Sequence, residues 1–372
     1  MRVLHLLDSL NRGGAEMLAL DVCRNARAHG DLDLTFVATG GGELEDDFRR
    51  SGTHYIRLAR RSPLDLKLIA QLRAVIKERG IEVVHCHQAV EALHAYLATI
   101  GTKTKRVLSF HLCAADAKNR IALKYLAPRM DANIAVSREL LSCLESEAGF
   151  ETKKNFHLVY NGIDARRLQA TAGADVRAEL KLAGSDLLLG MVGNFYADAR
   201  KDQLTVCRAL PTVFRRAANA HFAFAGGYQE AESRVYQDCV DYCRQAGIAE
   251  RVHFLGRRAD VPNVLNALDL FVFSSRRDTF GVAVVEAMLA GVPCVVSDIG
   301  ALREVSGEGH YAALFRTGDA EDLSLQLVEL IRDSARRARL GAEAKRWAGE
   351  RFGIESHIAE LLELYKSPAR VP

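Results

Sequence analysis

Residues 268–297 constrain the fold of this chain more than any other stretch. An apolar run opens the stretch and a second one closes it, and each has the length and the Val and Phe content of a buried strand. The apolar segment 279–290 between them has the length of a helix, with Asp278 or Thr279 as its N-cap and Gly291 just after its end. This order predicts a βαβ unit of a parallel sheet, in which ligands bind at the loop after the first strand.

The loop before this helix has the chemistry of an anion and sugar site. We expect the backbone N–H groups of Phe280, Gly281 and Val282 to be unpaired at the helix start and to bind phosphate or sugar oxygens. Glu286 follows Asp278 by about two helical turns, or about 10 Å. The two carboxylates therefore suit the sugar and ribose ends of one elongated ligand better than a shared proton or metal. The alternative is that Asp278 only caps the helix and Glu286 is a solvated helix residue.

Strand-like and helix-like segments alternate along most of the 372 residues, which is enough chain for two domains. We predict an α/β protein in which each domain has a parallel sheet. The polar, Ala-rich residues 165–185 are interpreted as the linker region.

Composition favours an ordinary globular protein. Charged residues make up 26% and hydrophobic residues 49% of the chain. Met1 leads directly into an apolar strand without a charged and then apolar leader, and no apolar run approaches the length of a membrane-spanning helix. The eight cysteines have no metal-binding spacing, so we expect buried thiols and a reducing cytoplasm.

Charge is unevenly distributed. Residues 51–130 contain fourteen Lys and Arg against five Asp and Glu, a local excess of +9 in a chain whose net charge is +3. Such a block favours an anionic partner. Its stretch 116–130 is basic and partly amphipathic, which fits either an ordinary surface helix or contact with an anionic membrane surface.

Two further features follow strands of the first half. Gly13 and Gly14 lie between the first strand and a helix, which suggests either an anion site or a plain tight turn. His111 ends the fifth strand. His85 and His87 have the spacing of a metal pair, but we discount them because alternate residues of a strand point to opposite faces.

Several of these motifs resemble, in the same order, those of the retaining GT-B glycosyltransferases of family four (glycosyl transferases group 1, E-x7-E type). Asp278-x7-Glu286 followed by Ala-Met-x-Ala-Gly-x-Pro resembles the E-x7-E segment, with Asp in place of the first Glu. The pentad Tyr160-Asn161-Gly162-Ile163-Asp164 resembles the segment that closes the first domain. Arg200-Lys201 resembles the segment that grips the donor diphosphate, although Asn194 stands where the family has an Arg.

The resemblance implies a role for each of these residues. Asp278 would contact the hydroxyls of the donor sugar, Glu286 the nucleotide ribose and Lys201 the diphosphate. Arg200 would compensate for the missing Arg. The resemblance also implies that the Gly13-Gly14 loop approaches the donor phosphate or the acceptor, and that His111 contacts the donor sugar.

The fold implied is GT-B, with two Rossmann-like doubly wound domains facing across a cleft. Residues 1–165 would form the acceptor-side domain, residues 166–349 the donor-binding domain, and a helix at about 350–372 would return to the first domain.

The reaction implied is transfer of a sugar from a nucleotide diphosphate sugar to an acceptor hydroxyl with retention. A UDP-sugar is favoured by its frequency in the family, and the acceptor would be a sugar or a lipid-linked one, in polysaccharide, lipopolysaccharide or glycolipid synthesis. No cofactor and no metal are expected, because Lys201 would stabilise the leaving group, and no nucleic acid partner is expected. The protein would be cytoplasmic or peripheral on the inner face of the cytoplasmic membrane. The alternatives are a GT-B nucleotide-sugar epimerase and a non-catalytic nucleotide-binding protein.

Overall fold

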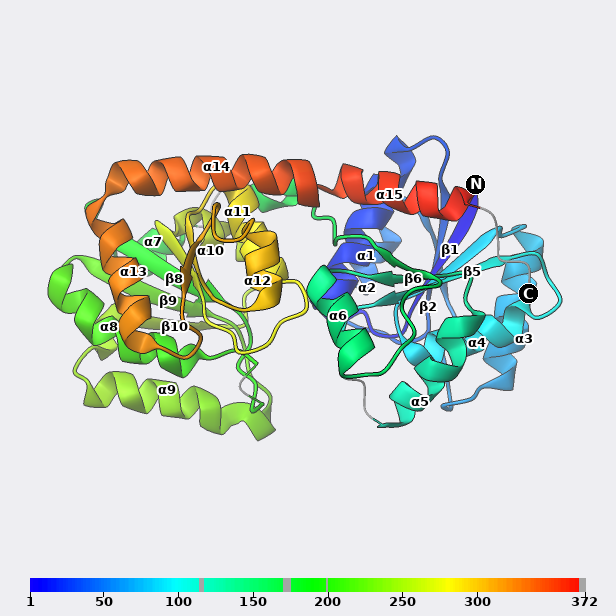
Figure 1. Ribbon diagram of the computed structural model, residues 1–372, viewed down its shortest axis with the longest axis horizontal. Helices are drawn as coiled ribbons and strands as arrows, with labels where there is room; N and C mark the ends of the chain where they lie inside the picture. Colours follow the sequence, from blue (N-terminus) through cyan, green and yellow to red (C-terminus); the bar gives the residue numbers. More distant parts are fainter. Residues whose placement is uncertain (114–116, 170–174, 199, 368–372) are drawn as a thin grey trace. The chain divides into compact units, whose positions relative to one another are not determined.

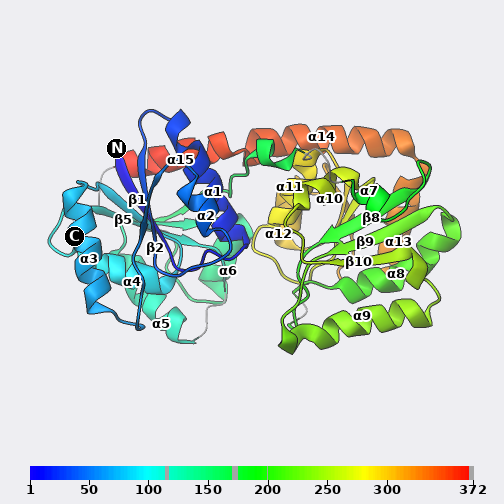
Figure 2. The ribbon, with the colours of Figure 1, turned by 180° about the vertical axis from the view of Figure 1, so that it is seen from behind.

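The computed structural model divides the chain into two compact units. The first comprises Met1–Ile163 with the C-terminal segment from Phe352, and the second is Asp164–Arg351. Each unit is built on one parallel sheet with helices on its faces (Figures 1 and 2), so the predicted α/β class with two doubly wound domains is confirmed. The residues described are 1–113, 117–169, 175–198 and 200–367.

The sheet of the first unit has seven parallel strands in the order β3-β2-β1-β4-β5-β6-β7. The strand order reverses between β1 and β4, which leaves a topological switch point at their carboxyl ends. The strands are β1 (Arg2–Leu7), β2 (Asp33–Ala38), β3 (His54–Arg57), β4 (Val83–Cys86), β5 (Lys105–Phe110), β6 (Ala132–Ala135) and β7 (Phe156–Leu158).

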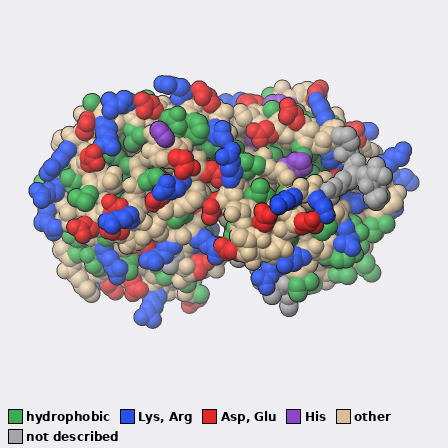
Figure 3. All heavy atoms as spheres, viewed as in Figure 1, with side chains coloured by type: hydrophobic (Ala, Val, Ile, Leu, Met, Phe, Trp, Pro, Cys, Tyr) green, Lys and Arg blue, Asp and Glu red, His purple; other side chains and the backbone are tan. Residues whose placement is uncertain are grey.

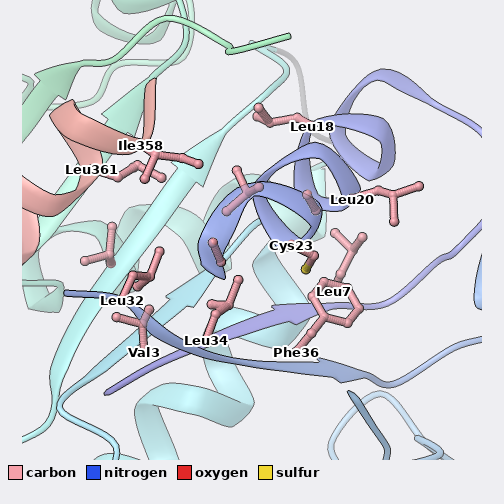
Figure 4. Close-up of a cluster of buried hydrophobic side chains, with 14 of the residues drawn as sticks. Val3, Leu7, Leu18, Leu20, Cys23, Leu32, Leu34, Phe36, Ile358 and Leu361 are labelled. Carbon is pink, nitrogen blue, oxygen red and sulfur yellow. The ribbon is translucent and has the colours of Figure 1, made fainter. Parts of the chain in front are cut away.

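Helices cover this sheet, and one of them comes from the far end of the chain. The helices of the unit are α1 (Gly14–Asn25), α2 (Glu45–Arg49), α3 (Leu66–Glu78), α4 (Ala89–Thr99), α5 (Ala117–Leu126), α6 (Arg138–Ser146) and α15 (Ile354–Lys366). Leu18 of α1 and Ile358 of α15 belong to the same hydrophobic core as Val3 and Phe36 of the strands beneath them (Figure 4). The burial of this shared apolar surface holds α15 on the first unit.

The backbone fixes the C-terminal segment as well. The N–H of Ile163 donates to the carbonyl of Phe352 at 2.9 Å, and the N–H of Ile354 donates to the carbonyl of Ile163 at 3.1 Å. A Cβ added to Gly162 would lie 2.4 Å from the Cβ of His357, so only glycine allows this approach. Residues 368–372 of the expected last helix lie outside the described residues, as does Asp116 at the start of the expected basic stretch.

The sheet of the second unit has six parallel strands in the order β10-β9-β8-β11-β12-β13, with its switch point between β8 and β11. The strands are β8 (Leu187–Val192), β9 (Ala220–Ala225), β10 (Val252–Gly256), β11 (Leu270–Phe273), β12 (Cys294–Ser297) and β13 (Ala313–Phe315). The helices are α7 (Val176–Glu179), α8 (Gln203–Arg216), α9 (Ser233–Gln245), α10 (Val261–Ala267), α11 (Val282–Ala290), α12 (Gly300–Val305), α13 (Ala320–Arg332) and α14 (Ser334–Phe352).

The interpretation of residues 165–185 as a linker is wrong for much of its length. A 3₁₀ turn, Ala165–Leu168, and α7 lie within it and belong to the second unit. The side chain of Asn266 in α10 donates to the carbonyl of Leu168 at 2.7 Å, which ties the turn to the body of the unit.

Candidate functional site

The candidate donor residues gather at the switch point of the second sheet. Gly193 and Asn194 follow β8, and the segment Ser274–Gly281 follows β11, its neighbour in the sheet. Lys201 forms an isolated antiparallel bridge with Ser275. This backbone pairing brings the Lys201 segment against the loop that carries Asp278.

Lys201 and Asp278 form an ion pair. The ammonium of Lys201 contacts Oδ2 of Asp278, and both side chains are largely buried. The same ammonium lies 4.2 Å from the ring centroid of Phe273, so an aromatic face supports the cation. Burial raises the pKa of Asp278, but the charge of Lys201 and the bonds from Lys201 and two backbone amides outweigh burial, and the pKa is lowered overall. Asp278 is therefore ionised at neutral pH.

The expected helix start needs correction. α11 begins at Val282, and its N-cap is Gly281 in the left-handed region with φ 88° rather than Asp278 or Thr279. Oδ1 of Asp278 accepts the N–H groups of Thr279, Phe280 and Gly281 at 2.8, 3.2 and 3.0 Å. The amides of Phe280 and Gly281 are therefore paired rather than unpaired, because the short Asp side chain folds back over its own turn. The role of Val282 remains a prediction.

Glu286 has a partner that the sequence reasoning missed. Its Oε1 lies 2.6 Å from Nη2 of Arg167, which the 3₁₀ turn Ala165–Leu168 provides. Glu286 is only 8% exposed, so the alternative of a solvated helix residue is wrong. The one local signal for Arg167 is its place just after Asp164, whose carboxylate caps the turn by accepting the N–H of Arg166.

Two glycine loops meet beside Asn194. Its Oδ1 accepts the N–H of Gly227 at 2.9 Å, so the residue that replaces the family's Arg bridges the loops after β8 and β9. A Cβ added to Gly226 would lie 2.1 Å from the carbonyl oxygen of Gly193, so only glycine fits at this crossing. Arg200 is exposed and pairs with Asp198 at 2.6 Å. Its predicted role as a substitute phosphate cation therefore requires that it leave Asp198.

In the first unit, Gly13 and Gly14 follow β1, one of the two strands at the switch point, and His111 follows β5, the neighbour of β4. Gly13 is the N-cap of α1 and has an extended backbone, and Gly14 is the first residue of the helix. The carboxylate of Glu16 lies over Gly13, where an added Cβ would be 2.5 Å from its Oε2. Burial raises the pKa of Glu16. A partly buried acid therefore lies at the loop where the resemblance implies the donor phosphate or the acceptor.

His111 belongs to a cluster of histidines rather than standing alone. Its Nε2 lies 3.1 Å from Nδ1 of His87. Burial is the main cause that lowers the pKa of His111 to about 4, so the ring is neutral near pH 7.

The reason given for discounting His85 and His87 is wrong, because residues two apart in a strand share a face. His85 lies in β4 and His87 directly follows its last residue, so the two side chains fall on the same face of the sheet. The two rings stack, with their centroids 4.6 Å apart. Together with His5 they place one nitrogen each within 4.8 Å of one another, close enough to hold a metal ion. These nitrogens have hydroxyl or imidazole partners, which are described below.

The expectation of eight free thiols is wrong at one pair. Cys113 and Cys143 form a disulfide with their Cα atoms 5.9 Å apart, because the segment after β5 lies beside α6. The other six cysteines are buried and free, which includes Cys239 and Cys243 as predicted.

The fold and the polar residues at its strand ends define a class of protein. Two Rossmann-like parallel sheets of this kind match solved GT-B glycosyltransferases. The chain aligns over 99% of its length with HepE (Alr3699) of Anabaena, crystallised with UDP and glucose, at a TM-score of 0.84 and 21% identity over 100% of that chain. A glycosyltransferase from Rickettsia africae matches 98% of this chain and 97% of its own at a TM-score of 0.84 and 15% identity.

The sequence gives the family. Residues 186–333 match the profile of "Glycosyl transferases group 1", and residues 12–167 match that of "Glycosyltransferase Family 4". The chain belongs to the group 1 glycosyltransferases with the GT-B fold and is a glycosyltransferase.

Curated relatives agree with this assignment. N-acetyl-alpha-D-glucosaminyl L-malate synthase of Bacillus anthracis is 26% identical over 319 residues, which cover 82% of this chain and 79% of that protein. The lipopolysaccharide core biosynthesis mannosyltransferase LpsB of Rhizobium meliloti is 26% identical over 304 residues, which cover 78% and 81%.

Proposed function

We propose that this glycosyltransferase transfers a hexosyl group from a UDP-sugar to an acceptor hydroxyl with retention of configuration, without a metal. The observation that carries the proposal is two largely buried ion pairs of the second unit, Lys201 with Asp278 at the switch point of its sheet and Arg167 with Glu286 on α11. Two anionic and two cationic groups, held separately, provide recognition at two places along one ligand. HepE, solved with UDP and with UDP-glucose, and the sugar-transferring relatives support the choice of donor.

The proposed chemistry follows from the first pair. The donor diphosphate attracts the ammonium of Lys201, and a sugar hydroxyl donates to the carboxylate of Asp278. The bond from the anomeric carbon to the phosphate oxygen breaks as the acceptor oxygen bonds to that carbon, and the acceptor proton goes to the leaving phosphate. Lys201 offsets the negative charge that develops on this phosphate, which is the task of a metal in other enzymes.

The second pair is assigned to the nucleotide. Glu286 would accept hydrogen bonds from the ribose hydroxyls, and Arg167 fixes the direction of its carboxylate before the nucleotide arrives. Gly281 and Val282, with Phe280, Asn194 and Arg200, would complete the donor site. His111, beside the sugar, and the Gly13-Gly14 loop, on the acceptor side, would act from the first unit.

Nucleotide binding is the first test. Thermal unfolding with UDP, GDP or ADP in EDTA should show stabilisation by UDP, by about 2.7 kcal/mol at 100 times its dissociation constant. Lys201→Met keeps the length of the side chain and removes its charge, so we expect weaker UDP binding and at least a hundredfold loss of transfer. Arg208→Met, on an exposed face of α8, is the matched control and should behave as the unaltered protein. The proposed donor site would be refuted if Lys201→Met bound UDP with the affinity of the unaltered protein. It would also be refuted if UDP stabilised the protein only when Mg²⁺ replaces EDTA.

Retention is tested on the product. NMR of the anomeric proton after transfer from an α-linked UDP-sugar should show an α-linked product. A β-linked product would overturn this part of the proposal.

We also propose that an anionic membrane surface presents the acceptor to the first unit. Lys and Arg side chains lie among exposed hydrophobic ones on the face shown in Figure 3. Of the eight large hydrophobic side chains that are exposed among the described residues, six fall in the basic region 51–130: Leu64, Leu66, Ile100, Leu112, Ile121 and Tyr125.

On this surface, α5 shows the clearest combination of exposed apolar and cationic side chains. Ile121 is 71% and Tyr125 52% exposed, and they lie one turn apart on the same face. The guanidinium of Arg129 lies 3.7 Å from the centroid of the Tyr125 ring, which places a cation beside the apolar side chains. Apolar side chains flanked by cations suit the boundary between acyl chains and anionic headgroups. Within the described residues, no helix combines the length and apolar character needed to cross a bilayer.

Vesicle sedimentation tests this surface. The protein should pellet with vesicles of phosphatidylglycerol and phosphatidylethanolamine, less so in high salt, and hardly with phosphatidylcholine alone. Ile121→Glu should abolish pelleting, whereas Leu325→Glu, at an exposed leucine of α13 in the second unit, should not. Equal binding of both variants would remove α5 from the proposal.

A further inference from the structure

A line of six polar side chains crosses the sheet of the first unit beneath α15. Five are buried, and His111 at the end of the line is half-buried. They come from β1, the ends of β4 and β5, and α15, so the fold brings them together over long distances in sequence. In spatial order the line runs Ser109, His85, Tyr365, His5, His87 and His111.

Each member lies within hydrogen-bond distance of the next. The first two contacts are Ser109 Oγ with His85 Nε2 at 2.7 Å, and His85 Nδ1 with Tyr365 Oη at 2.6 Å. Tyr365 Oη then lies 3.0 Å from His5 Nε2. The last two contacts join imidazoles, His5 Nδ1 with His87 Nε2 at 3.3 Å and His87 Nδ1 with His111 Nε2 at 3.1 Å.

The rings are neutral near pH 7, because burial lowers the pKa of all four histidines, to about 3 for His5 and about 4 for His111. A neutral imidazole has one N–H and one lone pair. Every ring between two partners must therefore donate on one side and accept on the other. The buried hydroxyl of Tyr365 has one proton that needs an acceptor, so it donates to one neighbour and accepts from the other.

These constraints leave two complete patterns for the line. If Ser109 donates to His85, every later member donates toward His111, and all four histidines carry the proton on Nδ1. If His111 donates to His87, every bond is reversed, and all four histidines carry the proton on Nε2. Any mixture either places two protons or two lone pairs face to face or leaves the proton of Tyr365 without an acceptor, and an unmade hydrogen bond is costly in a buried site.

We infer that the four histidines share one tautomer, all Nδ1–H or all Nε2–H, and that Tyr365 is a positioning residue that joins the proton of His85 to that of His111. The tautomer of His111 is then decided along the whole line rather than by its nearest neighbour. Its Nδ1 is a donor in one pattern and an acceptor in the other. This decides which hydrogen bond His111 offers to a sugar hydroxyl, and that last step rests on the function proposed above.

The tautomers can be measured directly. Long-range ¹H–¹⁵N correlation spectra of ligand-free protein with ¹⁵N-labelled histidine distinguish the N–H nitrogen from the nitrogen with the lone pair in each ring. His94 is an internal reference. Its Nδ1 lies 2.7 Å from the carbonyl of Val90 and its Nε2 accepts the N–H of Asp65, so it is an Nδ1–H tautomer. We expect His5, His85, His87 and His111 to match one another, and different tautomers among the four would overturn the inference.

A hydroxyl deletion tests the link. Tyr365→Phe keeps the ring and separates His85 from the other three, so the tautomer populations of His85 and His111, equal in the unaltered protein, should become unequal. Tyr96→Phe, in α4 of the same unit, is the control and should leave them equal. Populations that stay equal in Tyr365→Phe would remove Tyr365 from the line. A stoichiometric transition metal in the purified protein would also overturn the inference, because the nitrogens would then be ligands.

A kinetic measurement separates this inference from the proposed function. Tyr365→Phe should lower kcat severalfold and leave UDP affinity unchanged, because the nucleotide residues belong to the second unit. The spectra are recorded without ligand. A shared tautomer with unchanged kcat would therefore uphold the line and reject the contact of His111 with the donor.

Discussion

Lowering the pH below 6.5 should destabilise the first unit, because five of its histidines resist protonation in the folded state. His5 and His357 are buried and His111 is half-buried, and their pKa values fall from the ordinary 6.5 to about 3, 4 and 4, in the order His5, His111 and His357, with desolvation as the main cause. His85 and His87 are shifted in the same direction. All five rings are thus neutral in the folded unit at a pH where the unfolded chain begins to bind protons.

The sign and size of the effect follow from linkage. Because the folded pKa values are depressed, the unfolded state binds more protons below pH 6.5, and stability is lost as the pH falls from 6.5 toward 4. At pH 5.5, each of the three histidines with a value costs about 1.4 kcal/mol, or about 4 kcal/mol together. His85 and His87 add to this loss. A domain has only about 5–15 kcal/mol of stability in total.

One buried acid opposes the histidines. Burial, and next the charge of Asp8, raises the pKa of Glu91 from 4.5 to about 7, so its contribution to stability is present below pH 4.5 and is lost as the pH rises through 7. Lowering the pH from 7.5 to 5.5 therefore adds about 2 kcal/mol to the free energy of unfolding through Glu91. The loss of stability from the three histidines is larger than this gain by about 2 kcal/mol. In Glu91→Gln the gain is absent, so the full loss of stability in acid should be measured.

Urea unfolding at several pH values measures the effect. Circular dichroism reports both units, whereas the fluorescence of Trp347 reports the second unit. The transition of the first unit should move to lower urea between pH 7.5 and 5.5. His357→Gln should reduce the loss of stability between pH 7.5 and 5.5 by about 1.4 kcal/mol, and His54→Gln, on an exposed position of β3, should not. A first-unit transition that is independent of pH in Glu91→Gln would refute the reasoning.

Two further perturbations test the backbone of the site and the disulfide. Gly281→Ala forces a left-handed φ of 88° on alanine and places its Cβ 2.6 Å from Leu302, so we expect a loss of about 1–3 kcal/mol and weaker UDP binding in thermal unfolding and calorimetry. An unchanged melting temperature would contradict the strain. Cys143→Ser opens a loop closed over a sequence separation of 30, which should cost about 4 kcal/mol in the chain-entropy description, and a reducing agent should have the same effect on the unaltered protein and none on the variant.

The local sequence pattern was enough to predict the parallel-sheet fold and the βαβ unit at the candidate site. The apolar runs around Asp278 predicted a βαβ unit, and β11, α11 and β12 are that unit. Lys201 was assigned to the same donor site as Asp278 by the resemblance to the family, and in the structure the two meet because they follow β8 and β11, which are neighbours in the sheet. The side chain of Asp278 folds back on three amides, which no period in the sequence encodes.

The contacts that were missed are those between residues far apart in sequence. Arg167 and Glu286 are 119 residues apart, and Cys113 and Cys143 are 30 apart. His87 was misjudged for a different reason. Side chains two residues apart in a strand point to the same face, so the strand pattern itself predicts that His85 and His87 lie together.

The return of the last helix sets the order in which the chain assembles during synthesis. The strands of the first unit are synthesised early, but the residues of α15 that complete their core are synthesised last. Tyr365, whose hydroxyl lies beside His5, is 360 residues away from it in the sequence. Asp164–Arg351, which is continuous, is complete before then. Until α15 is synthesised, the histidines that it covers and the apolar face of the sheet therefore remain exposed. A chain that ends at residue 351 would keep the donor residues of the second unit, but its first unit would lack α15.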